Sequence, residues 1–159
     1  MRMDKVADPV VEAWPEEFVE LYRARRTSMV RLAYLLTAGD PAAEELVQEA
    51  FLRVRSHWSE VAQPVPYLRT AVVNACRNQT RRRGIERRHD VPVETTEGPD
   101  VAVRMVIARL PERQRAVVVL RYFEDLPEAE IAAVLGCSLS AVKSLLHRTV
   151  RELREVIER

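Results

Sequence analysis

Residues 126–153 read LPEAEIAAVLGCSLSAVKSLLHRTVREL, and this stretch decides how the C-terminal part of the chain folds. Ile131 and Leu135 lie four positions apart, so both fall on one face of a helix. Gly136 follows at once and can adopt the left-handed conformation that a tight turn between helices needs. Ser138 is a natural N-cap for a second helix, so the pattern predicts a helix-turn-helix. The apolar stripe of that second helix consists of Val142, Leu145, Leu146, Val150 and Leu153.

The opposite face of this second helix is polar, and its side chains suit phosphates and base edges of DNA. With the N-cap included, these residues are Ser138, Ser140, Lys143, Ser144, His147, Arg148 and Arg151. An ordinary helical hairpin with a solvated face would have a similar polarity. We favour DNA binding because the small Ala132, which lets the second helix approach closely, coincides with the turn glycine, the N-cap and the apolar positions.

Length and composition fit a small globular protein without a membrane span. The chain has 159 residues, of which 47% are hydrophobic, enough for one domain or two small ones. No long apolar run or signal peptide is visible, so we expect a cytoplasmic protein that does not enter a membrane. Cys76 and Cys137 lack partners at metal-binding spacing, so we expect reduced thiols, no metal site and no cofactor.

Glycine is rare and prolines mark the boundaries, so we predict an all-α protein of two small helical domains on a flexible linker. After an N-terminal arm, residues 1–15, the first domain covers residues 16–83, with helices expected at 16–36, 42–57 and 66–83. The polar segment 84–100 is the linker. The second domain, residues 101–159, holds a helix at 101–110, another opened by Pro111, and the helix-turn-helix. This domain is winged-helix-like but has no wing.

The net charge is only +1, but basic residues cluster around the third expected helix, which suits binding of nucleic acid on some faces only. Amide and arginine side chains there lie three or four positions apart, with two aromatic residues nearby. Together such groups can hydrogen-bond and stack on unpaired bases, although a solvated helix face explains them equally well. These residues are Trp58, Tyr67, Asn74, Arg77, Asn78 and Arg81.

Three motifs, in this order, resemble the bacterial extracytoplasmic-function sigma factors, the small two-domain initiation subunits of RNA polymerase. They are AEELVQEAFLRV at 43–54, PYLRTAVVNACRNQTRRR at 66–83, and LPERQRAVVVLRYFEDLPEAEIAAVLGCSLSAVKSLLHR at 110–148. The resemblance covers residues 16–154. It implies that the first domain is sigma region 2 and that the second domain is sigma region 4.

The resemblance also implies what each motif binds. The helix-turn-helix would read the promoter minus-thirty-five element, with Arg121 and Arg113 as additional contacts to the DNA backbone. The third helix would read and melt the minus-ten element through Asn74 and Asn78, with Arg82 joining Arg77 and Arg81 near the phosphates. The departures are Tyr67, where many relatives carry Trp, and the pair Leu139–Ser140 at the start of the recognition helix.

The acidic helix of the first motif has a strong apolar face, and its spacing alone favours a solvated surface. The resemblance implies instead that it docks on the clamp helices of the largest polymerase subunit. The residues that belong to this docking or to the packing that supports it are Glu45, Leu46, Gln48, Glu49 and Phe51. The implied partners are core RNA polymerase, through clamp helices and flap, and promoter DNA; an anti-sigma factor is a further partner that no residue here identifies.

Two other classes of protein share part of this pattern. A dimeric helix-turn-helix regulator would need a sensing domain in residues 16–83, and the asparagines and arginines of the third helix argue against it. A helical adaptor that binds only protein leaves the recognition-helix chemistry unexplained. An enzyme is disfavoured because the sequence has no cluster of nucleophile and base, no metal-ligand spacing and no phosphate-binding glycines.

Overall fold

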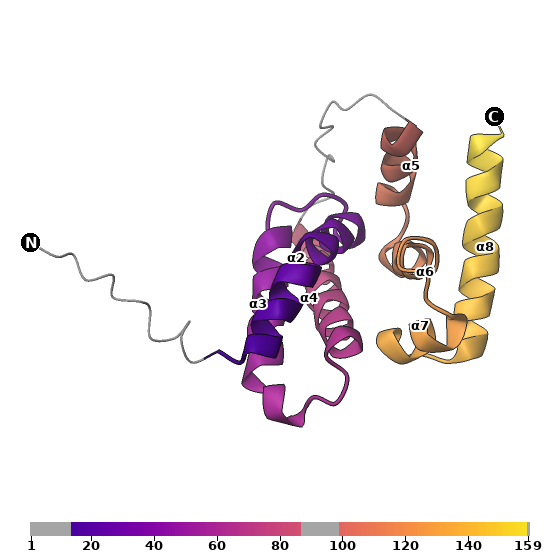
Figure 1. Ribbon diagram of the computed structural model, residues 1–159. Helices are drawn as coiled ribbons and strands as arrows, with labels where there is room; N and C mark the ends of the chain where they lie inside the picture. The colour runs from indigo at the N-terminus through magenta and orange to yellow at the C-terminus, as the bar shows by residue number, and fades with distance from the viewer. Residues whose placement is uncertain (1–13, 87–98, 159) are drawn as a thin grey trace, which may run out of the picture.

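The computed structural model describes residues 14–86 and 99–158, and every regular element in those two ranges is a helix. The expected N-terminal arm and the centre of the expected linker fall at 1–13 and 87–98, outside the described residues. The helices form two units, α2 to α4 and α5 to α8, which lie side by side (Figure 1). The prediction of an all-α protein with two small helical domains is confirmed.

The first unit is a three-helix bundle of α2 (Glu16–Leu36), α3 (Ala43–Ser56) and α4 (Pro64–Glu86), with a short 3₁₀ turn η1 (Trp58–Glu60). Phe18 anchors its core, with its ring edge-on to Trp14 at 5.4 Å and to Trp58 at 5.5 Å between centroids. Such edge-to-face pairs add to the gain from apolar burial. Trp58 is therefore half-buried against the bundle.

Helix α4 is longer at both ends than the spacing predicts. It begins at Pro64 rather than Pro66, because a proline is tolerated in the first turn, where its missing N–H has no partner to lose. It also continues through Gly84 to Glu86, into the segment expected as linker. The α2–α3 turn forms at the predicted Gly39, whose φ is 80°, together with Ala38 at 55°.

The second unit contains α5 (Pro99–Ala108), α6 (Glu112–Tyr122), α7 (Glu128–Leu135) and α8 (Leu139–Ile157). The predicted helix-turn-helix is present: Gly136 has a φ of 66°, and the axes of α7 and α8 meet at a bend of 108°. The Ser138 Oγ accepts a hydrogen bond from the Ala141 N–H at 3.0 Å, as expected of an N-cap.

The apolar stripe of α8 differs from the prediction at one position. Val142 and Leu146 are buried, whereas Leu145, Val150 and Leu153 are only partly covered. Thr149 is fully buried in the same stripe because its hydroxyl donates to the Leu145 carbonyl at 2.7 Å. A threonine satisfied in this way can replace an aliphatic residue in the core.

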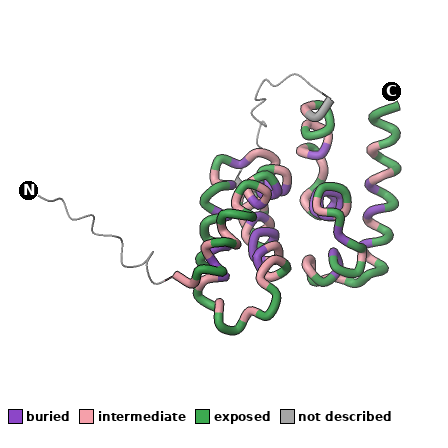
Figure 2. The backbone as a smooth tube through the Cα atoms, viewed as in Figure 1, coloured by how far each residue is buried: buried purple, intermediate pink, exposed green. Residues whose placement is uncertain are grey.

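The two units share one contiguous buried core, and their facing helices pack against each other (Figure 2). Helix α6 lies against α2, and α7 lies against α4. The sequence pattern did not predict this packing. Among the described residues, no single helix is long and apolar enough to cross a membrane. Helices α7 and α8 together have enough length and apolar composition for a span, but the pair is bent by 108° between them.

Candidate nucleic-acid interface

The polar face of α8 is exposed along its whole length. Val142 and Leu146 attach the helix to α6 and α7, so the side chains half a turn away point outward. The exposed polar residues are Ser138, Ser140, Lys143, Ser144, His147, Arg148 and Arg151. All members of the predicted recognition face are therefore accessible to a ligand.

A hollow of about 780 Å³ adjoins this face, between α8 and the end of α6. It brings Arg121, predicted from the resemblance, into the same lining as Lys143, His147 and Arg151. Arg113 is exposed on the first turn of α6 and does not line the hollow. Glu128 is the one acidic residue of this lining, and the basic side chains around it outnumber it, which suits the phosphate backbone of a duplex.

Sequence reasoning missed three residues of this hollow, Tyr122, Glu128 and Arg154. Arg154 lies one helical turn beyond Arg151 on the same edge of α8, and that spacing could have revealed it. Tyr122 ends α6 with 58% of its surface exposed, and the guanidinium of Arg121 lies 5.9 Å from its ring centroid. A phenol at this place can donate a hydrogen bond to a phosphate oxygen.

The predicted residues of α4 fall into two groups. Asn74, Asn78, Arg81 and Arg82 are exposed, on the outer side of the helix. Arg77 is half-buried instead: its guanidinium forms an ion pair with the Glu112 carboxylate and donates to the Leu135 carbonyl at 3.3 Å. Both acceptors belong to the second unit, so in this conformation Arg77 does not face solvent with the asparagines.

The aromatic residues near α4 are only partly available. Tyr67 is half-buried, with its ring 6.4 Å from that of His57, and Trp58 packs against Phe18. Each keeps part of its surface at the N-terminal end of α4. A base that stacks there would reach only part of either ring.

Helix α3 separates its predicted residues by the face on which each lies. Glu45, Gln48 and Glu49 are exposed and form an acidic outer stripe. Leu46 and Phe51 are 5% and 2% exposed, so they belong to the core and support the stripe without presenting a surface of their own. Sequence reasoning missed Leu52, which continues the stripe at i+3 from Glu49 and is 56% exposed.

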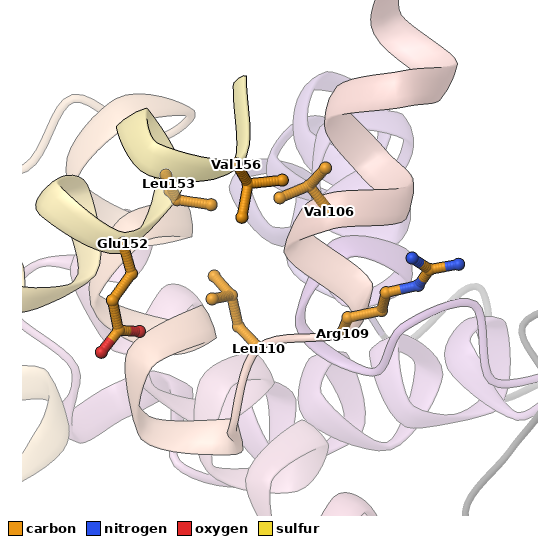
Figure 3. A pocket seen from close by; sticks show the side chains of 6 residues that line it. All are labelled: Val106, Arg109, Leu110, Glu152, Leu153 and Val156. Atoms are coloured by element: carbon orange, nitrogen blue, oxygen red, sulfur yellow. The ribbon is translucent and has the colours of Figure 1, made fainter. Parts of the chain in front are cut away.

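A second, smaller hollow of about 220 Å³ lies between α5 and α8. Val106, Leu110, Leu153 and Val156 point toward one another around it, while the charged ends of Arg109 and Glu152 lie at its rim (Figure 3). These residues of α8 lie on the side opposite to Lys143 and Arg151. The unit therefore has a polar face and an apolar groove on different sides.

Two buried titratable groups lie outside these faces. Burial lowers the pKa of the Arg115 guanidinium, partly opposed by nearby Glu112. Burial, with a smaller contribution from Asp40, raises the pKa of the Cys76 thiol to about 12. Cys76 is thus a neutral core thiol, and Cys137 is free as well. Within the described parts of the chain, no three His, Cys, Asp or Glu side chains lie close enough together to hold a metal ion.

The fold and its exposed basic faces are those expected of a helical protein with a DNA-binding helix-turn-helix. Comparison with known proteins specifies the family. Residues 21–85 match Sigma-70 region 2, and residues 100–153 match Sigma-70, region 4. The RNA polymerase sigma-E factor of Streptomyces avermitilis is 35% identical over 156 residues, which cover 89% of this chain and 86% of that protein. The Streptomyces coelicolor sigma-E factor is 35% identical over 153 residues, 87% of this chain and 85% of that protein.

Solved structures agree on the fold. The sigma factor RpoE of Bartonella quintana, crystallised with the anti-sigma factor NepR, has a TM-score of 0.75 at 19% identity over 91% of this chain and 98% of its own. SigJ of Mycobacterium tuberculosis has a TM-score of 0.63 at 27% identity over 85% of this chain and 52% of its own. The chain belongs to the extracytoplasmic-function sigma factors of RNA polymerase. Its regions 2 and 4 mediate binding of core polymerase and recognition of the minus-ten and minus-thirty-five elements.

Proposed function

We propose that region 4, residues 101–159, reads the minus-thirty-five element with the exposed face of α8 in the major groove. The observation that supports this most directly is the exposure of Lys143, Ser144 and His147 opposite a fully buried Val142. A recognition helix contacts bases with its N-terminal residues, and Ser140, Lys143 and Ser144 occupy that part of α8. Arg121, Arg151 and Arg154 then hold the phosphates beside it.

Region 2, residues 16–83, reads the minus-ten element on a strand that has been opened. Asn74 and Asn78 lie one turn apart on the exposed side of α4, so one base edge can reach both amides. Arg81 and Arg82 follow at the positions where a strand's phosphates would continue. Flipping a base costs a few kcal/mol, so this small unit needs the binding energy of polymerase to melt DNA.

Two surfaces bind core polymerase in this proposal. The stripe of Glu45, Gln48 and Glu49 on α3, with Leu52 as its apolar centre, docks on the clamp helices. An exposed leucine beside polar groups gives this stripe an apolar centre with a polar rim, which is the usual composition of a protein interface. The flap occupies the apolar groove between α5 and α8, which lies away from the DNA face and leaves that face free.

The remaining assignments follow from this role. The protein catalyses no reaction itself, because polymerase supplies the chemistry, and it works in the cytoplasm, where polymerase and chromosome are. An anti-sigma factor is the regulatory partner in this proposal, since the similar RpoE was crystallised with one. Its binding would cover the exposed faces of α4 or α8.

Run-off transcription tests the proposal. Purified core polymerase is incubated with a pool of genomic promoter fragments, with and without this protein, and the start sites are mapped. We expect defined starts that need the protein and that weaken at least tenfold with Lys143→Ala. Arg104→Ala, which removes one exposed charge from α5 of the same unit, is the matched control and should retain them. Tight duplex binding with no new starts would favour a conventional regulator.

A further inference from the structure

A buried carboxylate lies in the turn between α2 and α3. Asp40 is 5% exposed, and its backbone N–H donates to the Thr37 Oγ1 at 3.3 Å. Its Oδ1 accepts a hydrogen bond from the Ala42 N–H at 2.8 Å, next to the start of α3. The other oxygen, Oδ2, lies 3.0 Å from the Arg83 Nε and 3.5 Å from the Gln79 Nε2. One carboxylate therefore joins the α2–α3 turn, the start of α3 and the end of α4.

The last turns of α4 depend on this carboxylate because they have no apolar anchor in the bundle. Leu68, Val72 and Cys76 are completely buried and fix the earlier part of the helix in the core. Among residues 77–84, in contrast, no side chain is buried. The contacts to Asp40 therefore tie this stretch of α4 to its own bundle. A buried charge that is paired in this way is also satisfied, whereas an unpaired one would be costly.

The face of α4 that Asp40 holds is opposite to the face that reads DNA in the proposed function. Gln79 and Arg83 lie one turn apart on the inner side of the helix, toward the α2–α3 turn. Asn78 and Arg81 are exposed on the other side, in line with Asn74. If the end of the helix rotated or bent away, Asn78 and Arg81 would leave that line. Holding the inner face thus fixes the direction of the outer face.

We propose that Asp40 is a positioning residue for the reading of the minus-ten element. It is too deeply buried to touch DNA, and it acts through Arg83, which keeps Asn78 and Arg81 aligned with Asn74. Its charge matters as well as its shape, because a hydrogen bond between ionised groups is roughly twice as strong as a neutral one. This inference rests on the proposed function of region 2.

Amide hydrogen exchange tests the anchor directly. Asp40→Asn keeps the side-chain shape and an acceptor for the Ala42 N–H, and it removes the charge that faces Arg83. We expect amides of residues 77–84 to exchange about tenfold faster in this variant, while those of residues 66–76 are unchanged. Val54→Ala, which trims a completely buried side chain of α3, controls for a general loss of stability and should not single out residues 77–84. Unchanged exchange in Asp40→Asn would overturn the anchor.

Run-off transcription with saturating core polymerase then tests the positioning. Starts on duplex promoters should fall about fivefold with Asp40→Asn and stay unchanged with Val54→Ala below its unfolding temperature. Arg83→Lys keeps a cation for Asp40 and should retain most starts, whereas Arg83→Gln should lose about as many as Asp40→Asn. Because the two residues act as one unit, the double variant Asp40→Asn, Arg83→Gln should be no worse than either single variant. Additive losses would contradict action through Arg83.

A second pair of double variants separates positioning from general damage. Arg81 lies beyond the last buried residue of α4, and Asn74 lies before it, so only Arg81 depends on the anchor. Adding Asp40→Asn to Asn74→Ala should cost the full loss of about fivefold, but adding it to Arg81→Ala should cost only about twofold. Equal losses in both backgrounds would overturn the positioning role and leave the sigma-factor role intact. If the native protein gives no starts, the proposed function fails, and hydrogen exchange still decides whether Asp40 holds α4.

Discussion

The turn at Gly136 offers a prediction whose size can be worked out from the structure. Gly136 has a φ of 66°, and a Cβ added there would have no heavy atom within 4 Å. Gly136→Ala therefore creates no clash, and its cost is the left-handed backbone alone, about 1–2 kcal/mol for an L-residue. Alanine also restricts the unfolded chain, which returns about 0.5 kcal/mol. We expect a net destabilisation of about 1 kcal/mol.

Gly84 supplies a matched control for the same substitution. It lies within α4, its Cβ would also meet nothing within 4 Å, and its φ is not positive. Gly84→Ala should therefore stabilise the protein by about 0.5–1 kcal/mol. At about 2–4 °C per kcal/mol for a chain of this size, thermal unfolding should show Tm shifts of opposite sign. Shifts of the same sign would refute the backbone argument for the turn.

Three further predictions concern single side chains. The Cys76 thiol has an ordinary pKa of 9.0 in the unfolded chain, and burial raises this pKa to about 12 in the folded protein. The unfolded chain therefore loses the proton first, and the free energy of unfolding should fall as pH rises between these values, by about 1.4 kcal/mol per pH unit. Cys76→Ala should remove that part of the slope in urea unfolding, and an unchanged slope would contradict the assignment. Arg115→Lys keeps the charge but loses the planar guanidinium that donates the buried hydrogen bonds. Urea unfolding should then show a free energy of unfolding that is lower by about 2 kcal/mol. An unchanged free energy of unfolding would count against these hydrogen bonds. Leu52→Ala should weaken binding to core polymerase by about fivefold in a fluorescence titration while leaving Tm nearly unchanged, and unaltered affinity would remove Leu52 from the docking face.

Local sequence signals predicted the helix-turn-helix because every part of it is encoded within a few residues. Gly136 follows the last apolar residue of α7, and Ser138 precedes α8 by one position, so turn and cap can be read without knowledge of the rest of the fold. Helix ends were less predictable. Pro64 and Pro66 both suit a first turn, and the local sequence does not distinguish between them; α4 begins at Pro64.

In α3, the helical spacing of the residues predicts which of them are exposed better than the family motif does. The resemblance implied that Leu46 and Phe51, together with Glu45, Gln48 and Glu49, belong to the polymerase docking or to the packing that supports it. In the structure those two residues are core, and the exposed apolar residue of the stripe is Leu52. A motif groups residues by position in the chain, whereas helical spacing separates them by face.

The side-chain contacts between the two units could not be predicted from the sequence. Arg69 and Glu124 are 55 positions apart, and Arg115 and Leu36 are 79 positions apart. No periodicity links such pairs, and an arginine that binds a carbonyl in another unit looks in sequence like any solvated arginine. Arg77 shows the consequence, because the pattern that placed it with Asn74 and Asn78 could not show that Glu112 engages it.

The most direct test of the central claim compares transcription from a closed duplex and from a template already open at the minus-ten element. Asn74→Ala, Asn78→Ala should abolish starts on the duplex but retain most activity on the open template, because the cost of exposing the bases has been removed. Thr27→Ala, at an exposed position of α2, should behave like the native protein on both templates. Undiminished starts on the duplex with the asparagine variant would contradict the role of α4 in reading and melting the promoter.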